Sequence, residues 1–102
     1  MIVNLTPHAI VVGAITIPPS GGVARVDVVL SNVGYVDGIP LVSGRYGAVS
    51  GLPDPVPGTT YIVSSMVRLA SPCRDDIVSP AEMVRDAAGR IIGCASFEVN
   101  PC

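Results

Sequence analysis

Short runs of Val and Ile, broken every few residues by Gly or Pro, limit the fold of this chain more than any other feature. Its 102 residues include 17 Val and 9 Ile, together with 11 Gly and 10 Pro. β-Branched residues favour strands, whereas Gly and Pro end regular elements and form tight turns. The pattern predicts a compact single domain over residues 1–102, mainly β or α+β, with six to eight short strands and one or two short helices.

The positions of the breaks predict several of these strands. Residues 9–17 are expected to form two short strands around Gly13, and the run 61–63 is expected to be the most buried strand. Asp37-Gly38 predicts a hairpin turn of type I′, because that turn needs positive φ at both central residues.

The segment 23–30 alternates in a way that gives it an apolar face. A strand points successive side chains to opposite sides, so every second residue of this segment shares a face. That face is wholly apolar and is expected to lie against the core: it consists of Ala24, Val26, Val28 and Leu30.

Two serines have the sequence context of helix N-caps. Ser64 precedes a short apolar segment that Pro72 stops, which predicts a helix of about one turn. Ser79-Pro80-Ala81-Glu82 has Ser at the N-cap, Pro at the first helical position and Glu two residues later, which predicts a second helical turn with a capping box.

The charge balance disfavours nucleic-acid binding. The net charge is −2, and the six basic residues, all arginines, do not form a basic stripe. Phosphate-backbone binding needs many cations to release counterions. No nucleic-acid partner is therefore expected.

The chain shows no sign of export or membrane insertion. The N-terminus lacks a basic region and a cleavage site of the secretory type. The longest apolar run, residues 9–17, is about half of the ~20 residues that a membrane span needs. The three cysteines, at positions 73, 94 and 102, form no C-x-x-C pair. We therefore expect a cytoplasmic protein without a membrane partner, a metal or another cofactor.

Two candidate ligand-binding groups lie near turns or helix starts. Histidine is the side-chain type most often used as a general base at neutral pH, so His8, which follows Thr6-Pro7, is a candidate general base or phosphate ligand. The alternative is a turn in which it bonds a backbone carbonyl. Ser64 precedes a predicted helix whose free N–H groups favour an anion, and ordinary helix capping is the alternative there.

The densest charge clusters are Arg74-Asp75-Asp76 and Arg85-Asp86. Arginine can fork onto phosphate, and carboxylates can accept from ribose hydroxyls or hold a divalent cation. No further carboxylate or histidine stands at a spacing typical of a metal site, so no metal ligand is predicted. Surface ion pairs are the alternative interpretation.

Several motifs together resemble a known group of proteins. They are Leu5-Thr6-Pro7-His8-Ala9-Ile10, Gly58-Thr59-Thr60-Tyr61-Ile62-Val63-Ser64, and Val84-Arg85-Asp86 followed by Gly89 and Ile92-Gly93-Cys94. With its N-terminal L-T-P-H and C-terminal V-R-D…G…I-G-C motifs, the chain resembles a family of small proteins encoded by tailed bacteriophages and by prophages. The resemblance covers nearly the whole chain.

The resemblance implies a phage context, and small phage proteins include inhibitors of bacterial defence. By analogy with these, we expect an anti-defence protein of the host cytoplasm, a homo-oligomer that sequesters a small phosphorylated nucleotide-like signal of the cyclic nucleotide or ADP-ribose type without turnover. Three arginines would hold phosphates, two hydroxyls would donate hydrogen bonds, a carboxylate would accept from a ribose, and the histidine would lie at the pocket edge. The predicted ligand-binding residues are Arg25, Arg74, Arg85, Thr6, Ser64, Asp86 and His8.

Two other functions remain open. One is a protein–protein interaction module, either an inhibitor of a host enzyme or an accessory phage protein, which predicts an exposed apolar patch. The other is a small hydrolase of a nucleotide signal that acts through His8 with Asp75 and Asp76. The preferred hypothesis assigns no catalytic residue.

Overall fold

The computed structural model describes residues 1–101 and confirms a mainly β chain with eight strands and one short helix. The elements are β1 (Ile2–Asn4), β2 (Ile10–Val12), β3 (Ile15–Ile17), β4 (Arg25–Val36), β5 (Ile39–Ser50), β6 (Thr60–Ile62), α1 (Ser65–Leu69), β7 (Ile77–Arg85) and β8 (Ile91–Val99). Six strands form one sheet, in the order β1-β6-β7-β8-β2-β3, and β4 and β5 form a separate two-stranded sheet.

The most buried segment of the six-stranded sheet is β6 with the residue that follows it. β6 pairs in parallel with β1 on one side and with β7 on the other. Strands in parallel pairs are covered on both faces and read as continuous apolar runs. Ile62 and Val63 are fully buried and Tyr61 nearly so, as the run 61–63 predicted.

The helix α1 begins and ends where the sequence predicted. The Ser64 hydroxyl accepts a hydrogen bond from the Val67 amide over 3.3 Å and caps the N-terminus. Pro72 follows shortly after the last turn, where a helix cannot continue. The helix buries Val67 in the core, which it shares with five other residues: Leu5, Ala24, Tyr61, Val63 and Ile77.

Asn4 fixes the turn that joins β1 to β2. Its side chain is buried and makes four hydrogen bonds, three within the turn and one to β3. The amide donates to the carbonyls of His8 and Ile17 at 2.8 and 3.0 Å. Its oxygen accepts from the backbone and the hydroxyl of Thr6. A buried amide costs little when all its bonds are made, so the turn is well determined.

The second predicted helix is wrong, because residues 79–82 lie inside strand β7. The Ser79 hydroxyl is taken by Arg68, whose Nε donates to it over 2.8 Å. Pro80 is opposite Phe97 of β8, and Glu82 has a φ of 53°. β7 continues from the buried pair Ile77–Val78 between β6 and β8. The pairing of Ile77 and Val78 with β6, and of residues 78–81 with β8, outweighs the local capping signal.

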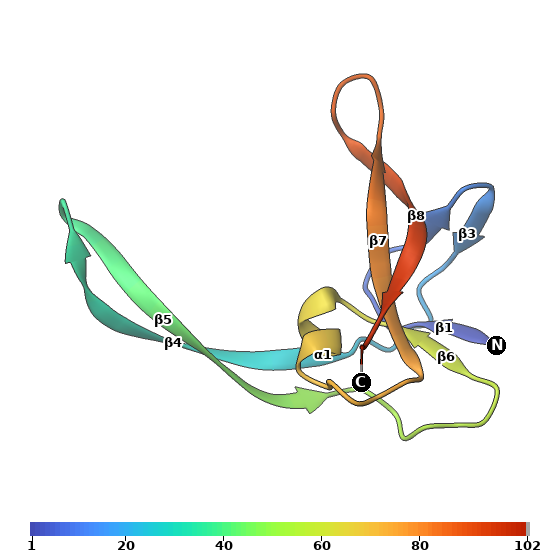
Figure 1. Ribbon diagram of the computed structural model, residues 1–102, viewed down its shortest axis with the longest axis horizontal. Helices are drawn as coiled ribbons and strands as arrows, with labels where there is room; N and C mark the ends of the chain where they lie inside the picture. Colours follow the sequence, from blue (N-terminus) through green and yellow to red (C-terminus); the bar gives the residue numbers. More distant parts are fainter. Residues whose placement is uncertain (102) are drawn as a thin grey trace.

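The β4–β5 hairpin projects away from the rest of the molecule (Figure 1). We call this hairpin, residues 25–50, the arm, and the six-stranded sheet with α1 the body. Asp37 and Gly38 at its tip have φ values of 48° and 77°, which confirms the predicted turn. The two strands of the arm have 12 residues each and are longer than the short strands expected from the sequence. The segment 23–30 and the residues that flank the Asp37-Gly38 turn belong to one continuous hairpin.

The apolar face predicted for the segment 23–30 reaches the core only in part. Ala24 is buried and Val26 packs against the core. Val28 and Leu30 are 42% and 63% exposed, contrary to the expectation that they face the core. The strand leaves the body after Val26, so its apolar alternation continues where the chain has nothing to cover it.

Within residues 1–101, no helix is long and apolar enough to cross a membrane.

Candidate functional site

Thr6 and His8, two of the residues predicted to bind a ligand, lie in the turn that Asn4 fixes. The Thr6 hydroxyl donates to Asn4 Oδ1 over 2.6 Å, with the His8 carbonyl 3.0 Å away as a second acceptor. The Thr6 side chain therefore already has polar partners. His8 is exposed and contributes to the lining of a groove between β2, β7 and β8.

Arg74 and Ser64 also have partners within the body. Arg74 forks onto Asp76, with Nε to Oδ1 and Nη2 to Oδ2 both at 2.7 Å, and Nη2 donates to the Pro53 carbonyl at 2.9 Å. The Arg74 hydrogen bond holds the pKa of the Asp76 carboxyl below its usual range, although desolvation acts in the opposite direction. The Ser64 hydroxyl caps α1. Here the structure has an internal ion pair and a helix cap.

Arg85 and Asp86 shape the turn between β7 and β8. Arg85 Nη1 donates to the Gly89 carbonyl over 2.7 Å. Asp86 Oδ1 accepts from the amides of Ala88 and Arg90 at 2.9 and 3.0 Å. These bonds close the turn, which protrudes from the sheet in Figure 1.

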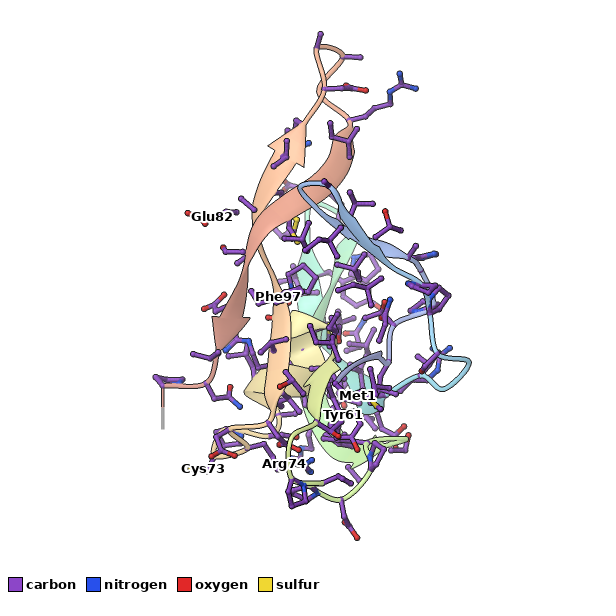
Figure 2. All side chains as sticks on the ribbon, turned by 90° about the vertical axis from the view of Figure 1, so that its right-hand side faces the viewer. Met1, Tyr61, Cys73, Arg74, Glu82 and Phe97 are labelled. Carbon is purple, nitrogen blue, oxygen red and sulfur yellow. The ribbon has the colours of Figure 1, made fainter. Side chains whose placement is uncertain are left out.

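The seven predicted residues do not gather in one place within the chain. Arg74 precedes β7 and Arg85 ends it. Eight residue steps of strand separate the ends of β7, roughly 26 Å at ~3.3 Å per step. Figure 2 accordingly shows Arg74 beside Tyr61, at the opposite end of the molecule from the β7–β8 turn. Arg25 is elsewhere again, at the start of β4.

The arm carries the most conspicuous surface of the molecule. Ten large apolar side chains between residues 28 and 46 are exposed, and they occur on both of its faces. They are Val28, Val29, Leu30, Val33, Tyr35, Val36, Ile39, Leu41, Val42 and Tyr46. Contiguous exposed apolar surface of this kind marks interaction sites in proteins.

One face of the arm, which we call the arginine face, has a polar hollow. The hollow has a volume of about 420 Å³ and is lined by Val29, Ser31, Val33, Ser43 and Arg45. Arg45 is exposed and forms no ion pair or side-chain hydrogen bond within residues 1–101. A free guanidinium beside two hydroxyls can bind an anion. Sequence reasoning missed these residues, although the alternation of residues 41–46 contained the signal.

The opposite face, which we call the uncharged face, meets the body at a notch. Tyr46 of the arm and Met66, Leu69 and Ala70 of the α1 segment line this notch, which has a volume of about 220 Å³. Met66 and Leu69 are exposed apolar side chains. Apolar surface therefore runs from the arm onto the helix without interruption.

The groove beside His8 is a third feature, with a volume of about 400 Å³. Its lining is largely apolar: Ala9, Ile10, Val11, Pro80, Met83, Ile91, Ile92, Gly93 and Cys94, together with His8. Cys94 is buried, as a structural thiol would be. In the described part of the chain, no group of three or more His, Cys, Asp or Glu residues is arranged to hold a metal ion.

Comparisons with protein-family models, with curated proteins and with solved structures found no match to this chain.

Proposed function

We propose that this chain is a non-catalytic protein–protein interaction module that acts through its arm. The observation that carries the proposal is a long hairpin, rich in exposed apolar residues, that its own chain leaves uncovered. An isolated two-stranded hairpin is marginally stable at best in water. A hairpin of this length with apolar residues on both faces is stabilised when another protein surface covers it.

The charges of the arm indicate what kind of surface it binds. Residues 25–50 contain two cations, Arg25 and Arg45, and two anions, Asp27 and Asp37. Their sum is zero, so electrostatic attraction to a strongly charged partner contributes little. The partner that fits is an apolar protein surface.

The resemblance to phage proteins supplies the proposed context. In the cytoplasm of an infected host, such a module would act as an inhibitor docked on a host enzyme or as an accessory phage protein. Neither role needs chemistry at the predicted acidic cluster. In that cluster Asp76 is already engaged by Arg74.

Site-specific photocrosslinking in the cells that make the chain tests the proposal. A photoreactive amino acid placed at Leu30 or Val42 of the arm, both exposed, is expected to form a crosslink to a protein. The matched control is Val56, which is 50% exposed in a loop of the body and should give no crosslink. Absence of protein crosslinks from both arm positions would overturn the interaction-module proposal.

The nucleotide-sequestering function is a second candidate, and the arginine face supports it. The free Arg45 guanidinium and the hydroxyls of Ser31 and Ser43 line one hollow. These groups could bind a phosphate, with Arg25 nearer the base of the same hairpin. Because Arg74 and Arg85 lie at opposite ends of the body, they would contribute to one nucleotide site only if different copies supplied them.

Native mass spectrometry of protein from cells with an active nucleotide-signalling defence tests this candidate. An adduct of nucleotide size that heat releases unchanged is expected for sequestration, and Arg45→Ala should abolish it. A hydrolysed product would indicate an enzyme instead. Protein without an adduct would exclude sequestration of the signal used in the experiment.

A further inference from the structure

The chain exposes more surface than a folded monomer of its size. Its accessible surface is 6743 Å², whereas a globular protein of 10.4 kDa exposes about 5,400 Å². The Cα radius of gyration is 16.1 Å, compared with about 13 Å for a compact chain of this length. The excess of roughly 1,300 Å² is more than the ~800 Å² that each partner buries in a standard protein interface.

The uncharged face of the arm is an extension of the core. At its base, Val26 and Val49 are cross-strand neighbours and both pack against the core cluster. Farther out, the register pairs Val28 with Tyr46, Asn32 with Val42, and Tyr35 with Pro40. Strand alternation, with the register shifts taken into account, places these residues and Leu30 on the same face.

The uncharged face has no ionised side chain within residues 28–46. Its polar side-chain groups are the Asn32 amide, whose Oδ1 accepts from the Gly34 amide over 3.0 Å, and the hydroxyls of Tyr35 and Tyr46. The arginine face differs, because burial of Arg45 without an anion would leave a charge unpaired. The uncharged face is therefore the one that an apolar partner can cover at the lower desolvation cost.

We propose that the partner on the uncharged face is a second copy of this chain. The two arms would pack face to face around a two-fold axis and run in opposite directions. Tyr35, near the tip of one arm, would then approach the notch beside Tyr46 and Leu69 of the other copy. This inference rests on the proposed function and names its partner.

A two-fold contact explains why apolar side chains of the arm are exposed, why apolar side chains of α1 are exposed beside them, and why the chain has excess surface. One self-complementary patch covers the same surface on both copies and closes the assembly, which is the commonest symmetry of oligomers. The contact buries Leu30 and Val42, and it also covers Met66 and Leu69 beside the notch. If this contact removes about 800 Å² of the excess surface from each copy, it reaches the size of a standard protein interface.

Sedimentation equilibrium of the full chain tests this inference by measuring its molar mass in solution. The concentrations run from about 1 to about 100 µM, on the order of those at which such dimers form. The wild-type chain is expected to be a dimer, and Leu30→Glu should weaken dimerisation at least 100-fold. Val29→Glu is the matched control: Val29 is adjacent, similarly exposed and on the arginine face, so this variant should remain a dimer. Circular dichroism checks that both variants retain a folded body.

A second variant distinguishes arm-to-arm pairing from docking of the arm in the groove beside His8. Ile91 is exposed and lines that groove. Ile91→Glu should leave the dimer intact in the proposed arrangement. If Ile91→Glu dissociates the dimer, or if Val29→Glu and Leu30→Glu dissociate it equally, the face-to-face pairing is wrong.

The outcomes separate this inference from the function on which it rests. A wild-type chain that stays monomeric at 100 µM, on the order of the weakest affinity compatible with a stable dimer, overturns self-pairing. If its arm still forms crosslinks to a different protein in cells, the interaction module stands with another partner. If the arm of such a monomer forms no protein crosslinks, both proposals fall.

Discussion

The arm and the body are built from similar residues but bury them very differently. In the body, Ile62 and Ile77 have no exposed surface. In the arm, Ile39 is 62% and Leu30 63% exposed. A strand keeps its apolar side chains dry only when a second layer covers them. The body has α1 and the turns around it as that layer, whereas the arm has none within its own chain.

The comparison shows that apolar alternation reports a buried face without saying which chain buries it. Val26, Val28 and Leu30 lie on the same face of β4, but only Val26 packs on the core. Removal of the apolar side chains of Val28 and Leu30 from water is as favourable as it is for Val26. In the proposed dimer the second copy covers them.

The largest difference should come from removal of a buried side chain of the body. Ile62→Ala deletes methyl groups from a fully buried site, so we expect a loss of about 2–5 kcal/mol in the free energy of unfolding. Ile39→Ala, its counterpart on the arm, should change this free energy by less than about 0.5 kcal/mol. Urea unfolding of both variants measures the contrast, and similar losses would contradict it.

Arginine substitutions should separate the two regions next. Arg68 is buried, and its guanidinium donates to Ser79 Oγ and lies 3.3 Å from Glu98. Arg68→Ala should cost about 2–4 kcal/mol, because Ser79 and the nearby polar groups lose a buried partner. Arg45→Ala on the arm should leave the free energy of unfolding unchanged within about 0.5 kcal/mol. A neutral Arg68→Ala variant in thermal unfolding would show that the body does not depend on this contact.

The junction between arm and body should tolerate change less than the arm tip. At Gly51, with a φ of +76°, a Cβ would overlap the carbonyl oxygen of Val23, so Gly51→Ala should destabilise the body by about 2–3 kcal/mol. At Gly38, with a φ of +77°, there is open space, and Gly38→Ala should cost about 1 kcal/mol. Thermal unfolding of the pair checks this order, which a larger loss for Gly38→Ala would reverse.

The smallest expected effect is an acid-dependent loss of stability in the body. The Arg74 hydrogen bond lowers the pKa of Asp76, so the folded state favours the ionised carboxylate. This contribution, on the order of 1 kcal/mol, is present above the unfolded-state pKa of about 4 and is lost as the pH falls through the lower folded-state pKa.

Unfolding measured from pH 6 to pH 2, a range chosen to span the ~3.9 pKa of an unfolded Asp, tests this linkage. Asp76→Asn should be less stable than wild type at the upper end, and the difference should shrink toward the lower end. Asp37→Asn at the arm tip should follow the wild-type curve. A constant difference between Asp76→Asn and wild type over the whole range would rule out the ion pair as its cause.

Much of the local structure is predictable from particular residues. The β2–β3 hairpin around Gly13, the Asp37-Gly38 turn, the Ser64 cap and the burial of Ile62 all follow from turn chemistry and apolar patterning. These are local properties of short segments.

What depends on distant residues could not be predicted. The capping-box signal at Ser79 fails because Arg68 donates to the Ser79 hydroxyl and β8 pairs with residues 79–81. The separation of Arg74 from Arg85 depends on β7 being a strand, because a helical turn would have shortened that distance. Arg45 becomes notable only when the hairpin aligns it with Val29 and places Ser31 and Ser43 beside it.

Amide hydrogen exchange at two protein concentrations tests most directly whether the arm depends on a second copy. If the proposed dimer forms, the amides of β4 and β5 beyond Val26 and Val49 are protected in concentrated protein and lose protection on dilution, while β6 and β7 exchange equally slowly in both samples. Arm protection that does not change with concentration would contradict the proposed dimer, because the arm would then be stable without a second copy.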